Sequence, residues 1–437
     1  MESVSVLLIL LTAWSARATN TPPPLPVLPL PSAQQLKWQL GGMAMFFHFG
    51  INTFTDSEWG TGQADPSLFN PGYLDARQWV RVAKEAGFRR VILTAKHHDG
   101  FCLWPSAYTN YSVKSSTWKG GNGDVVAELA AAAREAGIGL GLYLSPWDRH
   151  EACYGDTLRY NQHYLAQMRE LLTRYSRQGD PDGSNWVPPE CDVSIRPGWF
   201  WHGSQQPKTA TSLLEIFYKS TGRNCMLLLN VPPNSTGLLA YEDVQVLHNF
   251  KDILNSIFSV NLAQNAIITA SSVRGNDFQF GASWILVDDI FTYWAPDEGQ
   301  EKWHLHIDLR RVISFNVLCL QEAIQLGQRV SRYHLDVLED GVWCTVMNGS
   351  TVGYKKLERF SPVSSQFLRL TIDEARADPL IAFFGLYMDN TSIVYANDSS
   401  KAISISGGTL TKINLTTLDG KIQSVSGNLS MNSVLTS

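Results

Sequence analysis

The amino-acid sequence predicts an α/β fold made of repeated strand–helix units, followed by an antiparallel β-sandwich. Three runs, at 43–50, 91–101 and 138–148, are apolar where they begin and polar or aromatic where they end. From residue 266 the chain changes to short alternating runs separated by turn residues. These observations favour a parallel sheet or a (β/α) barrel in the first part and a sandwich in the second.

Two helices between the strand runs have clear start and stop signals. Asp75 and Asp124 stand at N-cap positions, and Gly87 and Gly137 stand where a left-handed C-cap belongs. Both helices end in Glu-Ala-Gly immediately before the next strand, about fifty residues apart, which indicates a repeated unit. Further elements are predicted as a helix at 164–175, a strand at 191–195, a helix at 211–218 and a strand at 226–230.

The expected fourth unit is missing. A strand should follow Tyr175 within a few residues, but 176–185 is polar and rich in turn-forming residues. We count about five strands before residue 260, whereas a closed barrel needs eight. The sequence therefore predicts an incomplete (β/α)8-type, TIM-like barrel with missing units near residue 176.

The second half reads as an antiparallel sandwich followed by a tail. Its strands are predicted at 266–272, 304–309, 317–321, 333–339, 366–372 and 381–387. Residues beyond 390 are rich in Ser, Thr, Asn and Gly, which predicts flexibility. The predicted organisation is a signal peptide at 1–18, a Pro-rich linker at 19–35, a barrel-like domain at 36–258, a sandwich at 262–390 and a tail at 391–437.

Several features predict an exported protein. An apolar run at 4–14 is followed by Ser-Ala-Arg-Ala, a pattern typical of a secretory signal peptide. Seven Asn-x-Ser/Thr acceptor sites agree with export: Asn110, Asn234, Asn348, Asn390, Asn397, Asn414 and Asn428. No later segment is long and apolar enough to span a membrane. We expect a secreted, extracellular protein, in the apoplast if the source is a plant.

Composition excludes some partners and leaves other questions open. The net charge of −5 gives no electrostatic case for nucleic acid. The six cysteines match no zinc spacing, so no metal site is predicted. Some cysteines are expected to pair in an exported chain, and Cys319 with Cys344 is one option. The sequence predicts no particular oligomeric state.

Histidines at two strand ends are candidate ligand contacts. His97 and His98 reach one ligand only if the backbone turns there, and the following Asp-Gly supplies such a turn. The functional interpretation is a pair of imidazoles that hydrogen-bond hydroxyl groups, and the alternative is one packed and one exposed histidine. His48, near the end of the first run, is either a further ligand contact or a core histidine.

Carboxylate and aromatic residues follow the same strands. Glu58 beside Trp59 is a pattern that suits a sugar, although a solvated loop pair is equally compatible. Tyr143, Trp147 and Asp148 close the third run, and Asp148 is either a catalytic carboxylate or a helix cap.

The segment 190–202 contains several further side chains that could bind a ligand or take part in catalysis. Glu190 and Asp192 share one strand face, and Arg196 suits hydroxyl or carboxylate recognition near Trp199. A glycosidase normally uses two carboxylates. Here none of Glu58, Asp148, Glu190 and Asp192 is identified as the nucleophile.

Six motifs, taken in order, resemble the α-L-fucosidases of glycoside hydrolase family 29. Within that family the resemblance is strongest to the plant enzymes and the α-1,3/4-type branch. The motifs are His48-Phe-Gly-Ile-Asn-Thr-Phe54, Glu58-Trp59, Ala95-Lys-His-His-Asp-Gly-Phe101, Tyr143-Leu-Ser-Pro-Trp-Asp148, Asp192-Val-Ser-Ile-Arg-Pro-Gly-Trp-Phe200 and Leu229-Asn-Val-Pro-Pro-Asn234. The later segments 266–274 and 303–309 look like the discoidin-type sandwich that follows the barrel in such proteins.

The resemblance implies a retaining hydrolase that removes terminal α-L-fucose from a fucosylated glycan or glycoprotein without a cofactor. It implies a fucose pocket lined by His48, Glu58, Trp59, His97, His98 and Tyr143, with Trp147, Arg196 and Trp199 as further contacts.

The chain departs from the family at the catalytic acids. Members carry the nucleophile Asp in a Trp-x-Asp-Gly-like context on the fourth barrel strand, and no such motif follows Tyr175. The acid/base Glu of the similar branch also belongs to the missing stretch, which leaves Glu190, Asp192 and Asp148 as substitutes. We therefore expect an impaired fucosidase. The alternatives are a secreted non-catalytic carbohydrate-binding protein, or a product that misfolds. Splicing, an error in the gene model and a true deletion all explain the gap.

Overall fold

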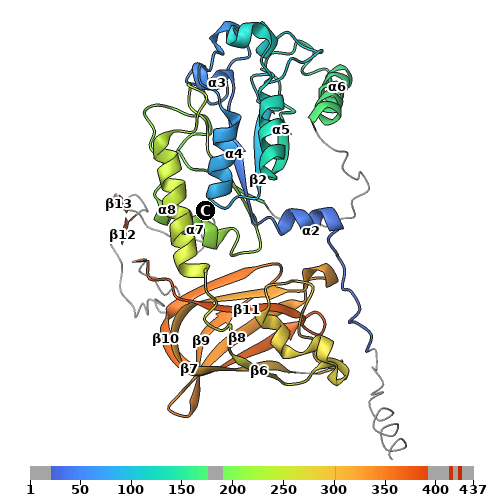
Figure 1. Cartoon of the computed structure of the whole chain (residues 1–437), viewed down its shortest axis with the longest axis vertical. Coiled ribbons are helices and arrows are strands. Elements are labelled where there is room, and N and C mark those ends of the chain that lie inside the picture. Colours follow the sequence, from blue (N-terminus) through green and yellow to red (C-terminus); the bar gives the residue numbers. More distant parts are fainter. Residues whose placement is uncertain (1–20, 176–189, 301, 392–412, 417–421, 426–437) are drawn as a thin grey trace, which may run out of the picture. The chain divides into compact units, whose positions relative to one another are not determined.

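The computed structural model describes residues 21–175, 190–300, 302–391, 413–416 and 422–425. The chain divides into two compact units, residues 1–393 and 394–437. The first unit holds an α/β part and a β-sandwich (Figure 1). In the second unit, β12 (Ile413–Thr416) pairs antiparallel with β13 (Ile422–Val425). The predicted signal peptide and most of the predicted tail lie outside the described residues.

A five-stranded parallel sheet forms the centre of the α/β part. Its strands are β1 (Met43–Phe47), β2 (Arg90–Lys96), β3 (Gly139–Leu144), β4 (Glu190–Ser194) and β5 (Met226–Asn230). The order is β3-β2-β1-β5-β4, and every pair is parallel. In a closed barrel each strand pairs with the next along the chain and the last pairs with the first. Here β5 pairs with β1, but β3 and β4 are not paired with each other. The prediction of an incomplete TIM-like barrel is confirmed, and the break lies between β3 and β4.

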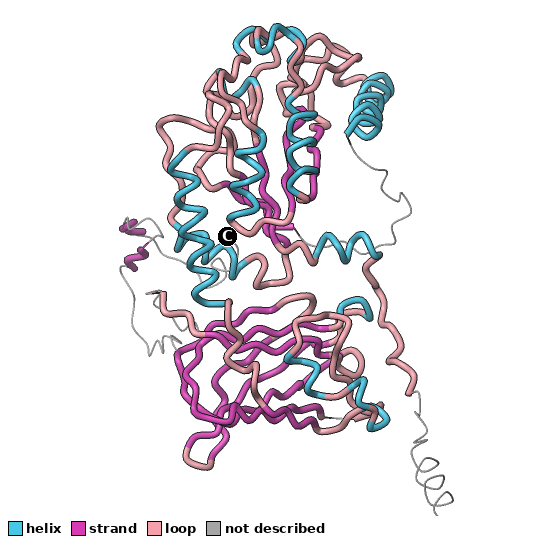
Figure 2. Tube along the Cα trace, in the orientation of Figure 1, coloured by secondary structure: helices cyan, strands magenta, loops and turns pink. Residues whose placement is uncertain are grey.

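Four helices, α4, α5, α7 and α8, pack on one face of this sheet (Figures 1 and 2). The α/β part contains α2 (Ala33–Gln39), α3 (Ile51–Phe54), α4 (Ala76–Glu85), α5 (Val125–Ala136), α6 (Thr157–Tyr175), α7 (Ala210–Lys219) and α8 (Tyr241–Phe258). The predicted caps are confirmed: Asp75 accepts a hydrogen bond from the Arg77 amide at 2.9 Å, and Asp124 accepts one from the Ala127 amide at 2.8 Å. Gly137 ends α5 with φ of 68°, a left-handed conformation that glycine adopts without strain.

The two faces of the sheet are packed differently. Alternate residues of β2, such as Val91 and Leu93, pack among the helices in the main core with Trp79 of α4. The opposite face carries a smaller cluster of Ala44, Phe46, Ile92, Met226 and Leu228. In a complete barrel this second face would line the interior.

An apolar cavity of about 850 Å3 lies beside β3, between α5 and α6. Its lining includes Leu140, Leu142, Met168 and Leu171. Because β2 is the only described partner of β3, this cavity lies at the open edge of the sheet. A complete barrel would pair its fourth strand with that edge.

One disulfide ties the other open edge of the sheet. Cys191 of β4 is bonded to Cys225, which immediately precedes β5. The option of a Cys319–Cys344 bridge is wrong, since both cysteines are free. Cys319 lies on β7 and Cys344 on β9, and β10 and β8 lie between those strands. Four strands in a row place the outer two about 14 Å apart, beyond the reach of a disulfide.

Replacing both bonded cysteines should destabilise the α/β part. A bridge that closes a loop of 34 residues contributes about 4 kcal/mol in the chain-entropy model. We expect the variant with Cys191→Ala and Cys225→Ala to lose several kcal/mol of unfolding free energy, measured by urea denaturation. Cys344→Ser, at a free cysteine in the sandwich, is the control and should lose little. Equal losses in the two variants would show that the bridge contributes nothing of its own.

The sandwich contains strands much longer than predicted. It has β6 (Ile267–Ala270), β7 (Trp303–Glu322), β8 (Val330–Glu339), β9 (Val342–Gly349), β10 (Lys356–Ala375) and β11 (Ile381–Tyr387), in the order β11-β7-β10-β8-β9 with β6 beside β7. The runs predicted at 304–309 and 317–321 are one strand, β7. The strand β9 and the first half of β10 were not predicted.

Residues of the predicted linker are bound to the sandwich. The Val27 amide donates to the Leu326 carbonyl at 3.0 Å, and the Arg329 guanidinium donates to the Leu25 carbonyl at 2.6 Å. Elsewhere, both guanidinium Nη atoms of Arg359 on β10 contact the carboxylate of Glu215 on α7. No helix within the described ranges is long and apolar enough to cross a membrane.

Candidate functional site

Side chains at the carboxyl ends of β1, β2 and β3 meet in one cluster. His48 follows β1, His97 and His98 follow β2, and Tyr143 lies near the end of β3. The ring centroids of His48 and His97 are 5.3 Å apart, and those of His97 and His98 are 4.0 Å apart. The Tyr143 ring lies 6.4 Å from His97. The structure therefore brings together four side chains that the resemblance assigned to one pocket.

Asn230, the last residue of β5, fixes the orientation of His48. Its Oδ1 accepts from the His48 backbone amide at 3.2 Å and lies 2.9 Å from His48 Nδ1. Its Nδ2 donates to Ser194 Oγ at 2.9 Å and to the Trp199 carbonyl at 2.7 Å. The amide oxygen must therefore face His48, which places the proton on Nδ1 and leaves Nε2 as an acceptor. Asn230 was not among the predicted site residues, although it ends an apolar strand as the other candidates do.

His97 and His98 have different surroundings. His97 is buried, and its Nδ1 has no hydrogen-bond partner among the described residues. His98 is half-buried, with its Nδ1 2.8 Å from Ser145 Oγ and its ring 5.0 Å from Trp147. An unpartnered buried nitrogen costs free energy, so His97 is a group that a polar ligand would satisfy.

Burial lowers the pKa of all three imidazoles. The pKa of His48 is lowered to about 4 and that of His97 to about 2, because burial disfavours the charged form. The hydrogen bond to Asn230 opposes this effect at His48. Burial and then Arg149 lower the pKa of His98. The cluster is neutral at pH 7, and a neutral imidazole has one donor and one acceptor, which suits sugar hydroxyl groups.

Stability should fall in acid because His48 is neutral when buried. Its pKa is about 4 in the fold against 6.5 in an unfolded chain, so the unfolded state binds more protons between those values. We expect His48 alone to account for about 3 kcal/mol of the unfolding free energy that is lost as the pH falls from 6.5 to 4, with a further loss from the buried His97. His48→Gln should remove the His48 contribution and so reduce the slope of unfolding free energy against pH, measured by urea denaturation at several pH values. The control is His248→Gln, which removes a histidine of α8 that lies outside the cluster.

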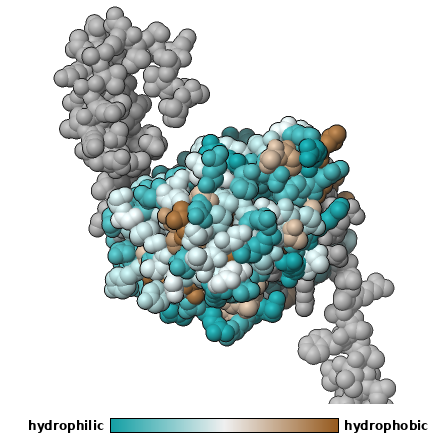
Figure 3. Space-filling view, turned by 90° about the horizontal axis from the view of Figure 1, so that it is seen from above, coloured by the Kyte–Doolittle hydropathy of each residue, from teal (hydrophilic) through white to brown (hydrophobic). Residues whose placement is uncertain are grey.

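Exposed indoles lie beside the histidines. Trp59 is 54% exposed, and its ring is 5.5 Å from Trp147 and 6.3 Å from His98. Trp199 is 36% exposed, and its ring is 5.2 Å from His48. Figure 3 shows one face of the molecule, which is mostly hydrophilic with scattered hydrophobic patches. Flat apolar rings beside neutral hydrogen-bonding groups suit a ligand with both C–H faces and hydroxyl groups.

Glu58 is occupied by the loop that carries Trp199. Its carboxylate accepts from the Trp199 amide at 2.9 Å and the Phe200 amide at 3.3 Å, and lies 2.6 Å from His202 Nε2. Burial opposes the charged form of His202, but the hydrogen bonds to Asp56 and Glu58 outweigh it and raise the pKa of His202. Glu58 therefore positions the Trp199 loop. His202 was not predicted as a site residue.

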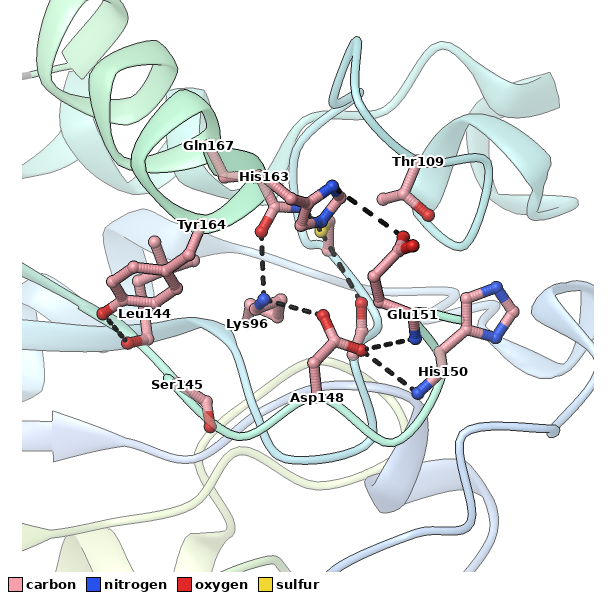
Figure 4. Close-up of polar contacts among 12 residues, drawn as sticks. Lys96, Thr109, Leu144, Ser145, Asp148, His150, Glu151, His163, Tyr164 and Gln167 are labelled. Atoms are coloured by element: carbon pink, nitrogen blue, oxygen red, sulfur yellow. Dashed lines mark hydrogen bonds and ion pairs between the residues drawn. The ribbon is translucent and has the colours of Figure 1, made fainter. Parts of the chain in front are cut away.

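Asp148 is held in a buried ion pair (Figure 4). Its Oδ2 is 2.8 Å from Lys96 Nζ, which also donates to Gln167 Oε1 at 3.0 Å. Its Oδ1 accepts from the backbone amides of His150 at 3.1 Å and Glu151 at 2.9 Å. These contacts give Asp148 the role of fixing the turn after β3. It does not cap a helix, since the next helix, α6, begins only at Thr157.

Arg196 is likewise engaged inside the protein. Its Nε is 3.0 Å from Asp243 Oδ2, and its Nη1 donates to the Gln205 carbonyl. Both members of this ion pair are buried. Arg196 therefore fixes the segment before Trp199, and no described contact points it at the histidine cluster.

Glu190 and Asp192 lie on β4, away from its carboxyl end. They pair in register with Met226 and Leu228, so they face the interior side of the incomplete barrel. Burial and then the neighbouring Asp192 raise the pKa of Glu190, and burial raises the pKa of Asp192. At 3.3 Å per residue, they lie about 13 Å and about 7 Å behind Ser194 at the strand end. Within the part of the chain that the structure describes, no three His, Cys, Asp or Glu side chains are placed to hold a metal.

Comparison with known proteins shows what this chain is similar to. Residues 47–180 match the family model described as alpha-L-fucosidase. The chain is 51% identical to alpha-L-fucosidase 1 of Arabidopsis thaliana over 454 residues, which covers 85% of this chain and 90% of the relative. It is 52% identical to a relative from Oryza sativa subsp. japonica over 468 residues, with 89% and 90% covered.

Solved structures give the same result. A GH29 fucosidase of Ruminococcus gnavus in complex with fucose is 29% identical, with a TM-score of 0.78 and coverage of 84% of this chain and 96% of that one. A glycoside hydrolase 29 family member from an unknown rumen bacterium is 32% identical, with a TM-score of 0.72 and coverage of 86% and 80%.

Proposed function

The chain belongs to the α-L-fucosidases of glycoside hydrolase family 29, and from this premise we propose that its histidine cluster binds a terminal α-L-fucose residue of a glycan. The proposal rests on the three adjoining neutral imidazoles of His48, His97 and His98, beside the exposed rings of Trp59 and Trp199. Imidazole nitrogens would bind the hydroxyl groups, and an indole would cover the apolar face and the methyl group.

We further propose that this chain cleaves the glycosidic bond slowly or not at all. Retaining hydrolysis needs two carboxyl groups about 5–5.5 Å apart, one as nucleophile and one as acid and base. Glu58 and Asp148 are each occupied by internal hydrogen bonds, and Glu190 and Asp192 lie back along β4. The nucleophile Asp and the acid/base Glu that the resemblance implies belong to the units missing between β3 and β4.

The lengths of the matches support a missing segment. The alignment with the Oryza relative is 468 positions long but covers 89% of 437 residues, which is about 389. About 79 positions of that alignment therefore have no counterpart in this chain. Three strand–helix units of a barrel that averages about 250 residues need about 90 residues, which is a similar length. The match to the family model ends at residue 180, close to the break.

A non-catalytic carbohydrate-binding protein is the second candidate function. It is favoured by the same observation: the side chains suited to sugar binding are retained on strands whose missing neighbours would carry the reactive acids. This candidate and an impaired enzyme differ only in whether any hydrolysis remains.

We propose that the protein is exported and glycosylated. The Cys191–Cys225 disulfide supports an oxidising compartment. The acceptor residues Asn110, Asn348 and Asn390 are exposed and Asn234 is half-buried, whereas Asn397 and Asn428 lie outside the described residues. An extracellular location, the apoplast if the source is a plant, follows from the same features.

Binding of free L-fucose to the full chain, measured by isothermal titration calorimetry, tests the fucose site. We expect L-fucose to bind and its enantiomer D-fucose not to bind, because the hydrogen-bonding nitrogens are fixed in space. His97→Ala should weaken L-fucose binding about tenfold, the loss of one good hydrogen bond. The matched control is His248→Ala, outside the cluster, which should bind like the unmodified chain. Equal binding of the enantiomers, or no effect of His97→Ala in a folded protein, would contradict the proposal.

A further inference from the structure

The outer face of the sandwich sheet carries two rows of polar side chains. Residues of β7, β10 and β8 alternate, with Leu305, Leu370 and Leu335 in the core and their neighbours on the opposite face. In register across the three strands lie His304, Thr371 and His334, and in the next row His306, Arg369 and Asp336. The labels in Figure 1 show these strands side by side in the sandwich.

Two hollows on this face share one histidine. One, of about 370 Å3, is lined by residues that include His306, Trp343 and Phe367, and the other, also about 370 Å3, includes His304, His306 and Arg369. Each has the volume of a small ligand site. His306 lines both hollows, so the two lie next to each other on this face.

The charges that line the two hollows are balanced and several of them are paired, so the face suits a neutral ligand. Arg369 Nε and Nη2 donate to Asp336 Oδ2 at 3.0 Å and 2.7 Å, and Thr345 Oγ1 donates to Asp336 Oδ1 at 2.7 Å. His334 Nδ1 is 2.9 Å from Asp373 Oδ2. The lining of the two hollows contains two cations, Lys302 and Arg369, and two acids, Asp308 and Asp373, so neither sign of charge dominates. An anionic or cationic ligand therefore gains no advantage there.

An aromatic surface and free polar groups complete the face. The Trp343 ring lies 5.7 Å from the ring of His306, and the Arg369 guanidinium carbon lies 4.8 Å from the same indole. Burial, then His304 and Arg369, lower the pKa of His306, so its ring stays neutral with one donor and one acceptor. Phe367, which lines the first hollow, is 42% exposed. A saccharide has apolar C–H faces, which pack on aromatic rings, and hydroxyl groups, which bind neutral donors and acceptors. This face offers both kinds of contact.

Asn348 lies on the same face. It pairs in register with His334 on the edge strand β9, it is exposed, and it is followed by Gly-Ser, which makes it an N-glycan acceptor. A glycan attached there would start at the end of the His304–Thr371–His334 row. The first two sugars of such a glycan are N-acetylglucosamines.

We propose that this sheet face is a second saccharide site, separate from the fucose cluster, that binds the N-acetylglucosamine core of an N-glycan across His304, His306 and Trp343. The N-acetylglucosamine core that binds there could come from either of two sources. One is the glycan of this chain at Asn348, and the other is a glycan of another molecule.

The site is tested with N,N′-diacetylchitobiose and the full chain produced without glycosylation, by ligand-observed NMR. We expect binding in the millimolar range, unchanged between low and high salt. His306→Ala and Trp343→Ala should each weaken binding at least fivefold, whereas the control His248→Ala should not. His97→Ala should also have no effect, and L-fucose should not compete. Loss of binding in His97→Ala, competition by L-fucose, or no effect of either sandwich variant would overturn this proposal while leaving the fucose site untouched.

The glycosylated chain distinguishes the two sources. If the glycan at Asn348 occupies the face, the glycosylated chain should bind free diacetylchitobiose at least fivefold more weakly, and Asn348→Gln should restore binding. Equal binding by the glycosylated and unglycosylated chains assigns the face to a glycan of another molecule. Absence of binding in the unglycosylated chain, with its fold intact, would overturn the proposal.

Discussion

Release of nitrophenol from 4-nitrophenyl α-L-fucoside by this chain is expected to be at least about 10⁴-fold slower than by the alpha-L-fucosidase 1 of Arabidopsis thaliana. The reason is the proposed absence of both reactive carboxyl groups from a chain that keeps the cluster of His48, His97 and His98. The relative has a stretch of about 80 residues that this chain lacks. Inserting that stretch between β3 and β4 should raise the rate of nitrophenol release at least about a thousandfold. The measurement is kcat/KM of the purified chain with and without the insertion.

The matched control carries the same insertion with its nucleophile Asp replaced by Asn. It completes the sheet but supplies no nucleophile, so it separates restored folding from restored chemistry. We expect it to bind L-fucose as the inserted chain does and to release little nitrophenol. Clear turnover by the chain without insertion, abolished by Glu190→Gln or Asp192→Asn, would show that those residues substitute for the missing acids.

The strand pattern of the α/β part was predictable because it depends on local chemistry. Asp75 and Asp124 cap helices in the sequence and in the structure, and Gly137 ends a helix in the left-handed conformation that few other residues adopt. The break was predictable too, because a barrel has a fixed number of strands and the polar stretch after Tyr175 cannot supply the next one. The strand order places that break between β3 and β4.

The contacts of the charged residues were not predictable. Asp148 and Arg196 stand in motifs shared with the resembling family, yet each is buried with a partner far along the chain, Lys96 and Asp243. Pairing over such separations depends on the tertiary fold, which residue spacing does not encode. Asn230 was missed although the sequence contained a signal for it. It is a polar residue that follows four apolar residues at the end of a strand, and the same pattern identified the candidate histidines.

The helix α8 and the long strands of the sandwich show two other limits. In α8, Leu247, Phe250, Leu254 and Ile257 are buried at helical spacing, so its signal was present in the sequence and was overlooked. In contrast, β7 continues through Arg310 and Arg311. These two charged residues interrupt the alternating apolar pattern, so the sequence predicted two separate strands there. Backbone pairing with β10 on both sides of that point keeps the strand continuous, and only the partner strand supplies that information.

Lys96→Met is expected to destabilise the α/β part by about 3–5 kcal/mol, the usual result of leaving a buried carboxylate without its cation. Lys96 is completely buried, and Asp148 is 3% exposed at a distance of 2.8 Å. The carboxylate also holds the turn after β3 through the amides of His150 and Glu151, so an uncompensated charge should loosen the turn that carries Trp147. Urea denaturation measures the loss, and weakened L-fucose binding is expected with it.

The matched control is Lys119→Met, which breaks the ion pair of Lys119 with Glu128 on the surface of α5. Exposed pairs contribute at most about 1 kcal/mol, since solvent screens both charges, so this variant should unfold nearly as the unmodified chain does. The double variant Lys96→Met and Asp148→Leu removes the unpaired charge and should regain part of the lost stability. It should not regain all of it, because the two backbone amides then lose their acceptor. A loss below about 1 kcal/mol in Lys96→Met would mean that water reaches Asp148 and that the turn depends on its backbone hydrogen bonds alone.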